Sequence, residues 1–227
     1  MPTLLITIIP SLLIVSFFVF SDKFKEPKKQ IIKIFGYGVI ITFIAGWLNY
    51  FLINFFSKNF GTNAAINESF LSAAFVEEGL KFLVLFYFVY KMQDFNERMD
   101  GLVYGICVSL GFATLENIDY VYWQNIQDFT SYEIAIWRSF SAIPAHGAFG
   151  LIMGYFFMKY SFVQKKNNLL FCFLFPYLLH GSYNYFLHFN FYISLVIIIL
   201  AWIVGLRLFF NLKDAQKRKK REYERKI

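Results

Sequence analysis

Two adjacent glutamates and a lysine lie inside an otherwise apolar stretch of the chain. Glu77, Glu78 and Lys81 occur in the run Phe75-Val-Glu-Glu-Gly-Leu-Lys-Phe82, with apolar residues on both sides. Each charge near the middle of a bilayer costs roughly 2.5–3.5 kcal/mol on insertion scales, so such residues are rare and usually functional. Lys81 follows Glu77 by four residues and Glu78 by three, so on a helix it can pair with either carboxylate. The spacing therefore predicts a buried, charged site on one helix.

Further polar residues interrupt three later apolar segments. They are Glu116 and Asn117, then His146, and then His180 and Asn184. His180 and Asn184 are four residues apart and share one helix face. At about 1.5 Å of rise per residue, the glutamates and histidines lie about 10–15 Å inside the same end of their helices. This matched depth predicts one polar cavity in the outer half of the membrane.

The residue types in this cavity suit hydrolysis inside a membrane. Of two neighbouring carboxylates in a low dielectric, one tends to keep its proton while the other acts as a base toward water. His180 and Asn184 can donate two hydrogen bonds to one developing oxyanion. Alternatively, Glu78, His146 and His180 can ligate zinc, with a water in the fourth position. The sequence leaves open whether the reaction depends on a metal and which glutamate is the base.

Composition places the chain in a membrane. It has 227 residues, of which 58% are hydrophobic and only 16% are charged, and its mean hydropathy is +0.49. An ordinary soluble domain is roughly 25% charged. Cys107 and Cys172 lack metal-ligand or disulfide spacing, so both are expected to be free, buried thiols. The net charge of +7 comes mostly from loops and the tail, a pattern that orients membrane proteins and does not indicate a nucleic-acid partner.

Seven apolar segments predict an all-α, multi-pass membrane protein. The first segment has no preceding basic residue and no cleavage site, so it is expected to be a membrane helix and not a signal peptide. We expect one transmembrane domain over residues 1–212, with a catalytic core at about 68–190, followed by a basic tail over 213–227. The segments are at about 4–20, 34–56, 68–90, 101–123, 137–160, 169–189 and 192–212.

The distribution of basic residues predicts the orientation. With the N-terminus outside, every lysine and arginine lies on the inner side except Lys58 and Arg138, in outer loops, and Lys81, within the membrane. Positively charged loops stay on the cytoplasmic side, so the C-terminus is expected in the cytoplasm. The basic tail is then expected to lie against anionic lipid headgroups, with each basic residue contributing on the order of 1 kcal/mol.

Five short motifs follow one another along the chain. They are Glu77-Glu-Gly-Leu-Lys81, Asp100-Gly-Leu-Val-Tyr-Gly105, Gly111-Phe-Ala-Thr-Leu-Glu-Asn117, Pro144-Ala-His-Gly147 and His180-Gly-Ser-Tyr-Asn184. In this order they resemble the PrsW family of intramembrane proteases. More distantly, the chain is similar to the CAAX prenyl-protease and bacteriocin-immunity superfamily, which also carries a Glu-Glu pair, a His and a His-x-x-x-Asn on separate helices.

The resemblance implies roles for the polar residues. Glu77 and Glu78 would be the catalytic pair. His146 and His180 would be their partners, and Asn184 would assist the oxyanion. The residues implied to line or support the site are Glu116, Lys81 and Asn117.

The activity implied by the resemblance is that of an intramembrane endopeptidase of the cell membrane. It would cut a single-pass membrane protein near the outer side, such as an anti-sigma factor in regulated proteolysis. Two other classes of protein remain as alternatives. A proton- or ion-coupled transporter also places carboxylates and histidines at the midplane, although the inverted repeat typical of transporters is not seen. A non-catalytic seven-helix sensor would have no need of the glutamate pair.

Overall fold

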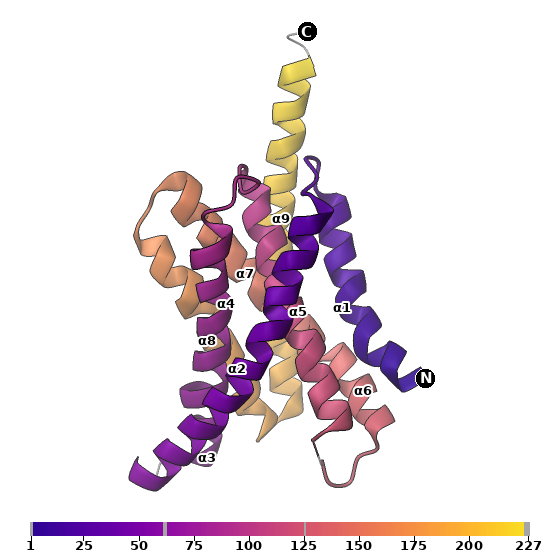
Figure 1. Cartoon of the computed structure of the whole chain (residues 1–227), viewed down its shortest axis with the longest axis vertical. Coiled ribbons are helices and arrows are strands. Elements are labelled where there is room, and N and C mark those ends of the chain that lie inside the picture. Colours follow the sequence, from indigo (N-terminus) through magenta and orange to yellow (C-terminus); the bar gives the residue numbers. More distant parts are fainter. Residues whose placement is uncertain (1, 61–62, 125, 225–227) are drawn as a thin grey trace.

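The computed structural model describes residues 2–60, 63–124 and 126–224, and these form helices joined by short loops (Figure 1). These ranges contain no strand, which confirms the expected all-α class. Two π-helical segments, η1 (Asn67–Ala74) and η2 (Leu85–Val89), flank α4. The helices are α1 (Pro2–Ser21), α2 (Lys28–Phe60), α3 (Ala64–Ile66), α4 (Phe75–Val84), α5 (Arg98–Tyr122), α6 (Ser131–Phe140), α7 (Ala142–Val163), α8 (Asn167–Leu187) and α9 (Phe191–Glu224).

In the described part of the chain, five helical stretches are long and apolar enough to cross a membrane. They are α1, α2, α5, the α6–α7 stretch Ser131–Val163, and Phe191–Arg218 of α9. The other two expected crossings are also helical: one is the continuous η1–α4–η2 helix and the other is α8. Both contain polar residues of the candidate site, which lowers their mean hydropathy.

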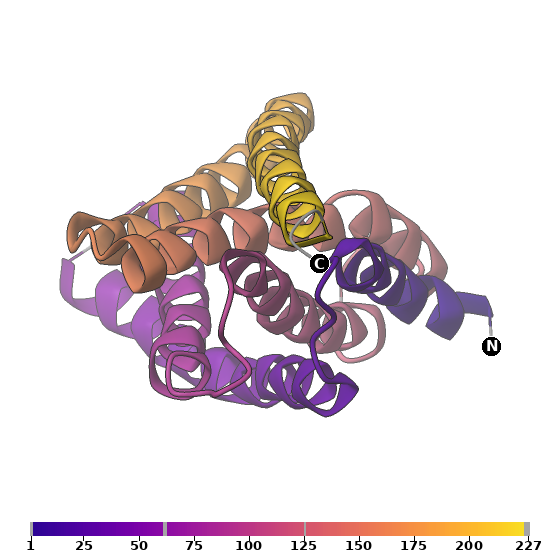
Figure 2. The same ribbon diagram turned by 90° about the horizontal axis from the view of Figure 1, so that it is seen from above.

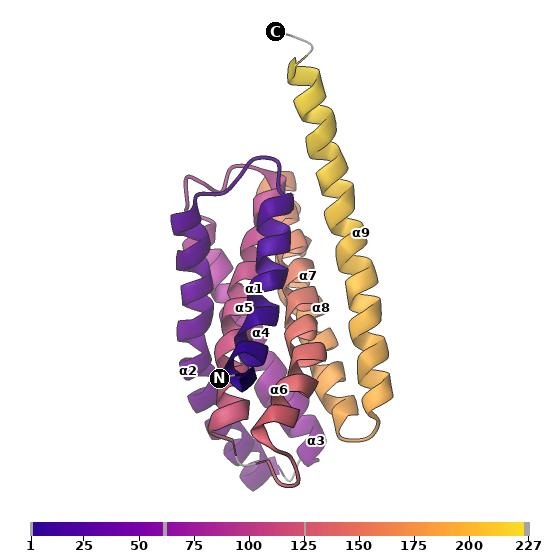
Figure 3. The same cartoon turned by 90° about the vertical axis from the view of Figure 1, so that its right-hand side faces the viewer.

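α5 and the α6–α7 stretch form the centre of the bundle. Their most apolar windows are 83% and 78% buried, whereas those of α1, α2 and α9 are 22–28% buried. Figures 2 and 3 show α2 and α9 on opposite sides of this centre. Their outer faces expose large apolar side chains such as Trp47 and Ile199, as expected for helices in contact with lipid. Cys107 and Cys172 are free and buried in the interior, as predicted.

The close contact between α5 and α7 depends on glycine. A Cβ atom at Gly154 would lie 2.2 Å from the carbonyl oxygen of Gly101, and one at Gly105 would lie 2.5 Å from that of Gly150. Both distances are far inside van der Waals contact, so a larger residue would push the helices apart. Gly150 and Gly154 are four residues apart and therefore form a small-residue packing face on α7. This contact fixes the spacing of two helices that line the candidate site.

The expected fifth segment, at about 137–160, is two helices in the structure. α6 begins earlier than expected because Thr130 and Glu133 form a capping box at its start. The chain then leaves helical geometry at Ser141, between α6 and α7. Pro144 provides the physical reason: it has no amide hydrogen to bond the carbonyl four residues earlier, so a single regular helix cannot run through it.

α9 continues without a break from the expected seventh segment into the expected basic tail. It extends to Glu224, whereas the predicted membrane segment ends at residue 212. Figure 3 shows this helix reaching beyond the rest of the bundle. Residues 225–227 of the predicted tail are outside the described residues.

One end of the bundle carries two of the loops and the extension of α9, and we call it the basic end. Figure 1 shows loops 22–27 and 90–97 together there. These loops contain Lys23, Lys25 and Lys91. The opposite end carries α3, the start of α6 and the turn between α8 and α9.

Candidate active site

α4 turns three charged side chains toward the interior of the bundle. Glu77, Glu78 and Lys81 are 4%, 0% and 0% exposed. Lys81 Nζ lies 2.8 Å from Glu78 Oε1 and 4.0 Å from Glu77 Oε2. The lysine can approach both carboxylates because they lie one helical turn before it, and it pairs mainly with Glu78.

π-helical turns enclose this charged turn at both ends. η1 precedes it with eight residues and η2 follows it with five. A π-helical turn is rare and frequently occurs at functional sites. Within η1, Ser72 Oγ donates to the carbonyl oxygens of Asn67 and Glu68. Asn67 Nδ2 donates to the carbonyl oxygen of Ile53 in α2 at 3.0 Å, so side-chain hydrogen bonds hold η1 in place.

Lys81 also contacts residues of α5 and α7. Its Nζ lies 2.9 Å from His146 Nδ1 and 4.3 Å from the centre of the Phe112 ring. A lysine ammonium group has three donors and no acceptor, so His146 Nδ1 accepts from it and carries no proton. The ammonium group is thus shared among Glu78, His146 and the face of an aromatic ring. Such partners offset the cost of burying its charge.

His180 of α8 lies between the two glutamates. Its Nδ1 is 2.8 Å from Glu78 Oε1, and its Nε2 is 3.9 Å from Glu77 Oε2. An ionised Glu78 that is paired with Lys81 only accepts hydrogen bonds, so His180 Nδ1 donates to it. His180 Nε2 then keeps its lone pair on the side of Glu77. Carboxylates fix the tautomer and ring orientation of metal-ligating histidines in this way.

A second set of contacts positions His146 on α7. Its Nε2 lies 3.0 Å from Glu116 Oε2 of α5, and it donates because the other ring nitrogen accepts from Lys81. Arg138 Nη2 of α6 bonds the same Glu116 oxygen at 2.8 Å. Arg138 Nε donates to Asn117 Oδ1 at 2.9 Å. Glu116 therefore contacts the site directly, whereas Asn117 contacts it through the arginine.

The sequence prediction for Arg138 is wrong. It places this residue in an outer loop, but the structure places it near the end of α6 with its side chain 16% exposed. The guanidinium group also lies 3.7 Å from the centre of the Tyr120 ring. The reason is that α6 starts at Ser131, so the arginine is in a helix that packs against α5. The capping box formed by Thr130 and Glu133 is the sequence signal that indicates this earlier start.

Glu77 and Glu78 each keep one oxygen free of hydrogen bonds. Glu77 Oε1 is within 3.4 Å of Asn49 Nδ2 in α2. Glu77 Oε2 and Glu78 Oε2 are buried, and no described residue offers either of them a hydrogen bond. Because buried polar atoms are nearly always satisfied, these two oxygens are suited to a substrate, a water or a metal. Asn49 is not among the predicted site residues, because its only signal in the sequence is a polar residue within an apolar segment.

Several residues of the charged cluster line the inner part of a cavity of about 960 Å³. Glu77, His146 and His180 contribute to its wall in the interior of the bundle. Glu68 and His188 line its mouth at the end opposite the basic end, where their side chains are 47% and 39% exposed. The cavity therefore connects the charged cluster to the surface at this end of the bundle, and it is also lined by Phe43 and Trp47 of α2, which are 68% and 69% exposed.

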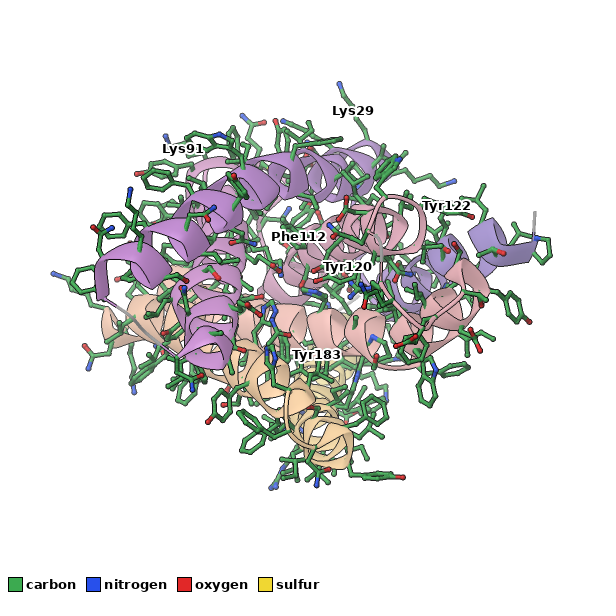
Figure 4. The ribbon with its side chains drawn as sticks, turned by 90° about the horizontal axis from the view of Figure 1, so that it is seen from below. Lys29, Lys91, Phe112, Tyr120, Tyr122 and Tyr183 are labelled. Atoms are coloured by element: carbon green, nitrogen blue, oxygen red, sulfur yellow. The ribbon has the colours of Figure 1, made fainter. Side chains whose placement is uncertain are left out.

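Aromatic side chains form much of the cavity wall. Phe112, Tyr120 and Tyr183 all line it, and Figure 4 shows them near the middle of the bundle. In the same view Tyr122 lies toward the margin. Asn184 also lines the cavity and is half-buried. It lies on the same face of α8 as His180. Its amide group is thus accessible to a molecule that enters the cavity.

Glu77, His146 and His180 have the donor atoms and the spacing of a metal site. One atom from each residue lies within 4.8 Å of the other two, and two imidazoles with a carboxylate are a ligand set of catalytic zinc. Glu77 Oε2 and His180 Nε2 fit because neither is engaged in a hydrogen bond. His146 fits when one of its ring nitrogens leaves its present partner. Glu78, which the sequence prediction groups with the histidines, instead orients His180.

Known proteins resemble this chain over most of its length. The model of the PrsW family of intramembrane metalloproteases matches residues 26–208. Protease PrsW of Geobacillus kaustophilus is 36% identical over 200 residues, which cover 85% of this chain and 84% of that protein. Protease PrsW of Oceanobacillus iheyensis is 33% identical over 215 residues, covering 92% and 94%, and that of Bacillus subtilis is 35% identical over 207 residues, covering 88% and 90%. No solved structure matches significantly.

The family model spans most of the chain, and the relatives match over most of their own length. The expected family is therefore confirmed, and with it an intramembrane protease in the cell membrane. The buried glutamates and histidines lie where several helices meet around the cavity, which is consistent with that activity. This chain belongs to the PrsW family of intramembrane metalloproteases.

Proposed function

We propose that this protease cuts a single-pass membrane protein in the 960 Å³ cavity, with Glu77, His146 and His180 as the ligands of a zinc ion. The observation that carries the proposal is Glu77 Oε2, a buried oxygen without a hydrogen-bond partner, 3.9 Å from His180 Nε2. A zinc ion held by these three residues would supply Lewis acidity toward a water and the scissile carbonyl.

Glu78 has two roles in this proposal. Its Oε1 accepts from His180 Nδ1 and from Lys81 Nζ, both at 2.8 Å, and so fixes the orientation of the imidazole ring. Its Oε2 is buried without a partner and acts as the general base that takes a proton from the attacking water. The proton can then pass to the leaving amine, as in general acid–base catalysis. Lys81 holds this carboxylate in place and balances its charge.

Glu116 and Arg138 act by positioning. Arg138 fixes the Glu116 carboxylate through a charge-assisted bond of 2.8 Å, and the same carboxylate oxygen accepts from His146 Nε2. Asn117 holds the other side of the guanidinium group at 2.9 Å. Asn184 lines the cavity without belonging to this chain of contacts, and we assign it to hydrogen bonding of the oxyanion.

We infer seven crossings, with the N-terminus outside and residues 213–227 in the cytoplasm. At 1.5 Å per residue, α8 over 167–187 is about 32 Å long. This length spans a hydrocarbon core of about 30 Å. Lysines at the basic end favour the cytoplasm for that end, and the tail then lies against anionic headgroups. The cavity mouth faces outward in this orientation, so cleavage occurs near the outer side.

The substrate class follows from this geometry and from the family. A site that opens outward suits a membrane-anchored regulatory protein whose extracellular juxtamembrane segment enters the cavity. An anti-sigma factor is such a protein, and its cleavage would begin a regulated proteolytic cascade. The apolar and aromatic wall suits a segment that leaves the membrane in an extended form.

The decisive experiment compares amide variants of the two glutamates in a purified system. The chain and a single-pass substrate are reconstituted in liposomes, and cleavage is measured for wild type, Glu77→Gln and Glu78→Gln. Both amides should abolish turnover, while Asp128→Asn, an exposed carboxylate outside the cavity, should cleave normally. Chelation should remove activity and zinc should restore it. Normal cleavage by both glutamine variants would show that the site is assigned wrongly, and activity after exhaustive chelation would rule out the metal.

A further inference from the structure

Three buried carboxylates lie together at the basic end of the bundle, in residues that the active site does not use. Asp22 follows α1, Glu26 precedes α2, and Asp100 is in the first turn of α5. These three residues are 3%, 8% and 0% exposed, in that order. One oxygen from each lies within 4.8 Å of the other two. Asp100 and Tyr104 also belong to a sequence motif to which the active site gives no role.

Neutral hydrogen-bond donors surround part of this cluster. Tyr104 donates its hydroxyl to Glu26 Oε2. No lysine, arginine or histidine in the described part of the chain forms an ion pair with any of the three carboxylates. The other donors are Phe24 N and Gln216 Nε2, which bond Asp22 Oδ1 at 3.1 and 2.8 Å, and Asn96 N and Glu97 N, which bond Asp100 Oδ2 at 2.8 and 2.7 Å.

The remaining oxygens of two of these carboxylates have no donor. Asp22 Oδ2 and Asp100 Oδ1 are buried and make no hydrogen bond in the described structure. Carboxylates that lack a counter-charge repel one another at such distances. A cation between them would satisfy the two free oxygens and balance the charge.

We propose that Asp22, Glu26 and Asp100 bind a hard divalent cation, of the class of Mg²⁺ and Ca²⁺. Carboxylate oxygens are the ligands that these ions prefer, whereas zinc favours nitrogen and sulfur. The two unpartnered oxygens of Asp22 and Asp100 are the ligand atoms, with one oxygen of Glu26. This second cation site shares no residue with the group formed by Glu77 and the histidines.

The cation would join two elements that are distant in sequence. Asp22 and Glu26 belong to the loop between α1 and α2, and Asp100 to the start of α5. Gln216 of α9 donates both to Asp22 Oδ1, at 2.8 Å, and to Glu97 Oε1, so α9 is attached to the same point. The site therefore fixes where α5 enters the bundle and holds the helix that carries Glu116.

Terbium luminescence tests the proposal directly, because Tb³⁺ is a hard cation and a tyrosine close to it sensitises its emission. The full chain is purified in detergent, treated with chelator and titrated with Tb³⁺. We expect one saturable site that Ca²⁺ or Mg²⁺ displaces. Asp22→Asn should weaken the binding at least tenfold, while Asp214→Asn, an exposed carboxylate on α9, and Glu77→Gln should leave it unchanged.

A thermal measurement covers variants that fold poorly. Asp100→Asn is expected to weaken binding as well, but this residue also caps α5, so Asp22→Asn carries the test if Asp100→Asn does not fold. Ca²⁺ or Mg²⁺ should raise the unfolding temperature of the chelated wild type and leave that of Asp22→Asn unchanged. Equal Tb³⁺ binding by wild type and Asp22→Asn would overturn the proposal. Loss of the Tb³⁺ site in Glu77→Gln would overturn it too, by assigning the signal to the catalytic group.

Discussion

Replacement of Lys81 by methionine should destabilise the protein strongly. Methionine keeps the length of the apolar stem but removes an ammonium group that lies 2.8 Å from Glu78 Oε1, 2.9 Å from His146 Nδ1 and 4.3 Å from the Phe112 ring. A buried ion pair that loses one partner costs about 3–5 kcal/mol, because the other charge stays buried without compensation. The lost cation–π contact adds about 0.5–2 kcal/mol. We therefore expect the free energy of unfolding to fall by at least about 3 kcal/mol.

A second substitution separates the unpaired charge from other effects of the methionine. In Glu78→Gln a neutral amide replaces the carboxylate. Lys81→Met in that background therefore leaves no uncompensated charge at position 78. The double variant should lose less stability than the sum of the two single variants. Residues in direct contact typically show coupling of about 0.5–3 kcal/mol. The separation of 2.8 Å and the complete burial of both groups place the expected coupling in the upper part of this range.

Reversible unfolding in mixed micelles, followed by far-UV circular dichroism, measures these differences. Lys58→Met is the matched control, since Lys58 is an exposed lysine in the last turn of α2. Its replacement should change the free energy of unfolding by less than about 0.5 kcal/mol. If the effects of Lys81→Met and Glu78→Gln prove additive, Lys81 does not act through its ion pair with Glu78 and the reasoning fails.

Four further predictions follow from the site and the fold. Asn184→Ala should lower turnover by about 10²–10³ with substrate binding kept, and a change in KM alone would contradict the oxyanion role. Arg138→Lys should not restore the activity lost in Arg138→Gln, because one ammonium group cannot contact both partners of the guanidinium fork; full recovery on an activity assay would refute this. Gly154→Leu should prevent folding, since its Cβ would lie 2.2 Å from the carbonyl oxygen of Gly101, whereas a normal unfolding curve would show that the helices can separate. A reporter fused to the C-terminus should be cytoplasmic in intact cells, and an external reporter would reverse the inferred topology.

The sequence predicts the composition of the site well, because its residues are costly exceptions in apolar segments. A lysine one turn after two glutamates leaves few alternatives to a buried ion pair on one helix. Matched depth on separate helices is enough to predict that the glutamates and histidines meet. The structure brings Glu78, Lys81, His146 and His180 within hydrogen-bond distance of one another in a connected chain.

The sequence predicts the contacts of individual atoms poorly, because those depend on helix rotation and on breaks. Arg138 reaches Glu116 only because α6 and α7 are separate helices. Hydropathy places an arginine at the edge of an apolar segment outside the membrane. It gives no reason to expect that the side chain contacts a residue in the interior. The candidate metal site contains Glu77 and not Glu78 for a similar reason. It depends on which of the two carboxylates forms the closer ion pair with Lys81.

The π-helical turns around α4 have a consequence for the phase of this helix. Each hydrogen bond that spans five residues adds one residue to its turn, so the side chains before η1 and after η2 do not keep the rotation of an uninterrupted α-helix. Helical-wheel projections through residues 67–89 would therefore assign lipid-facing and interior positions incorrectly on at least one side of the glutamates. Deleting a single residue from η1 would restore a regular turn and rotate everything before it by about 100° relative to the glutamates. The orientation of the glutamate pair thus depends on the number of residues in the π-helical turns as much as on the identity of those residues.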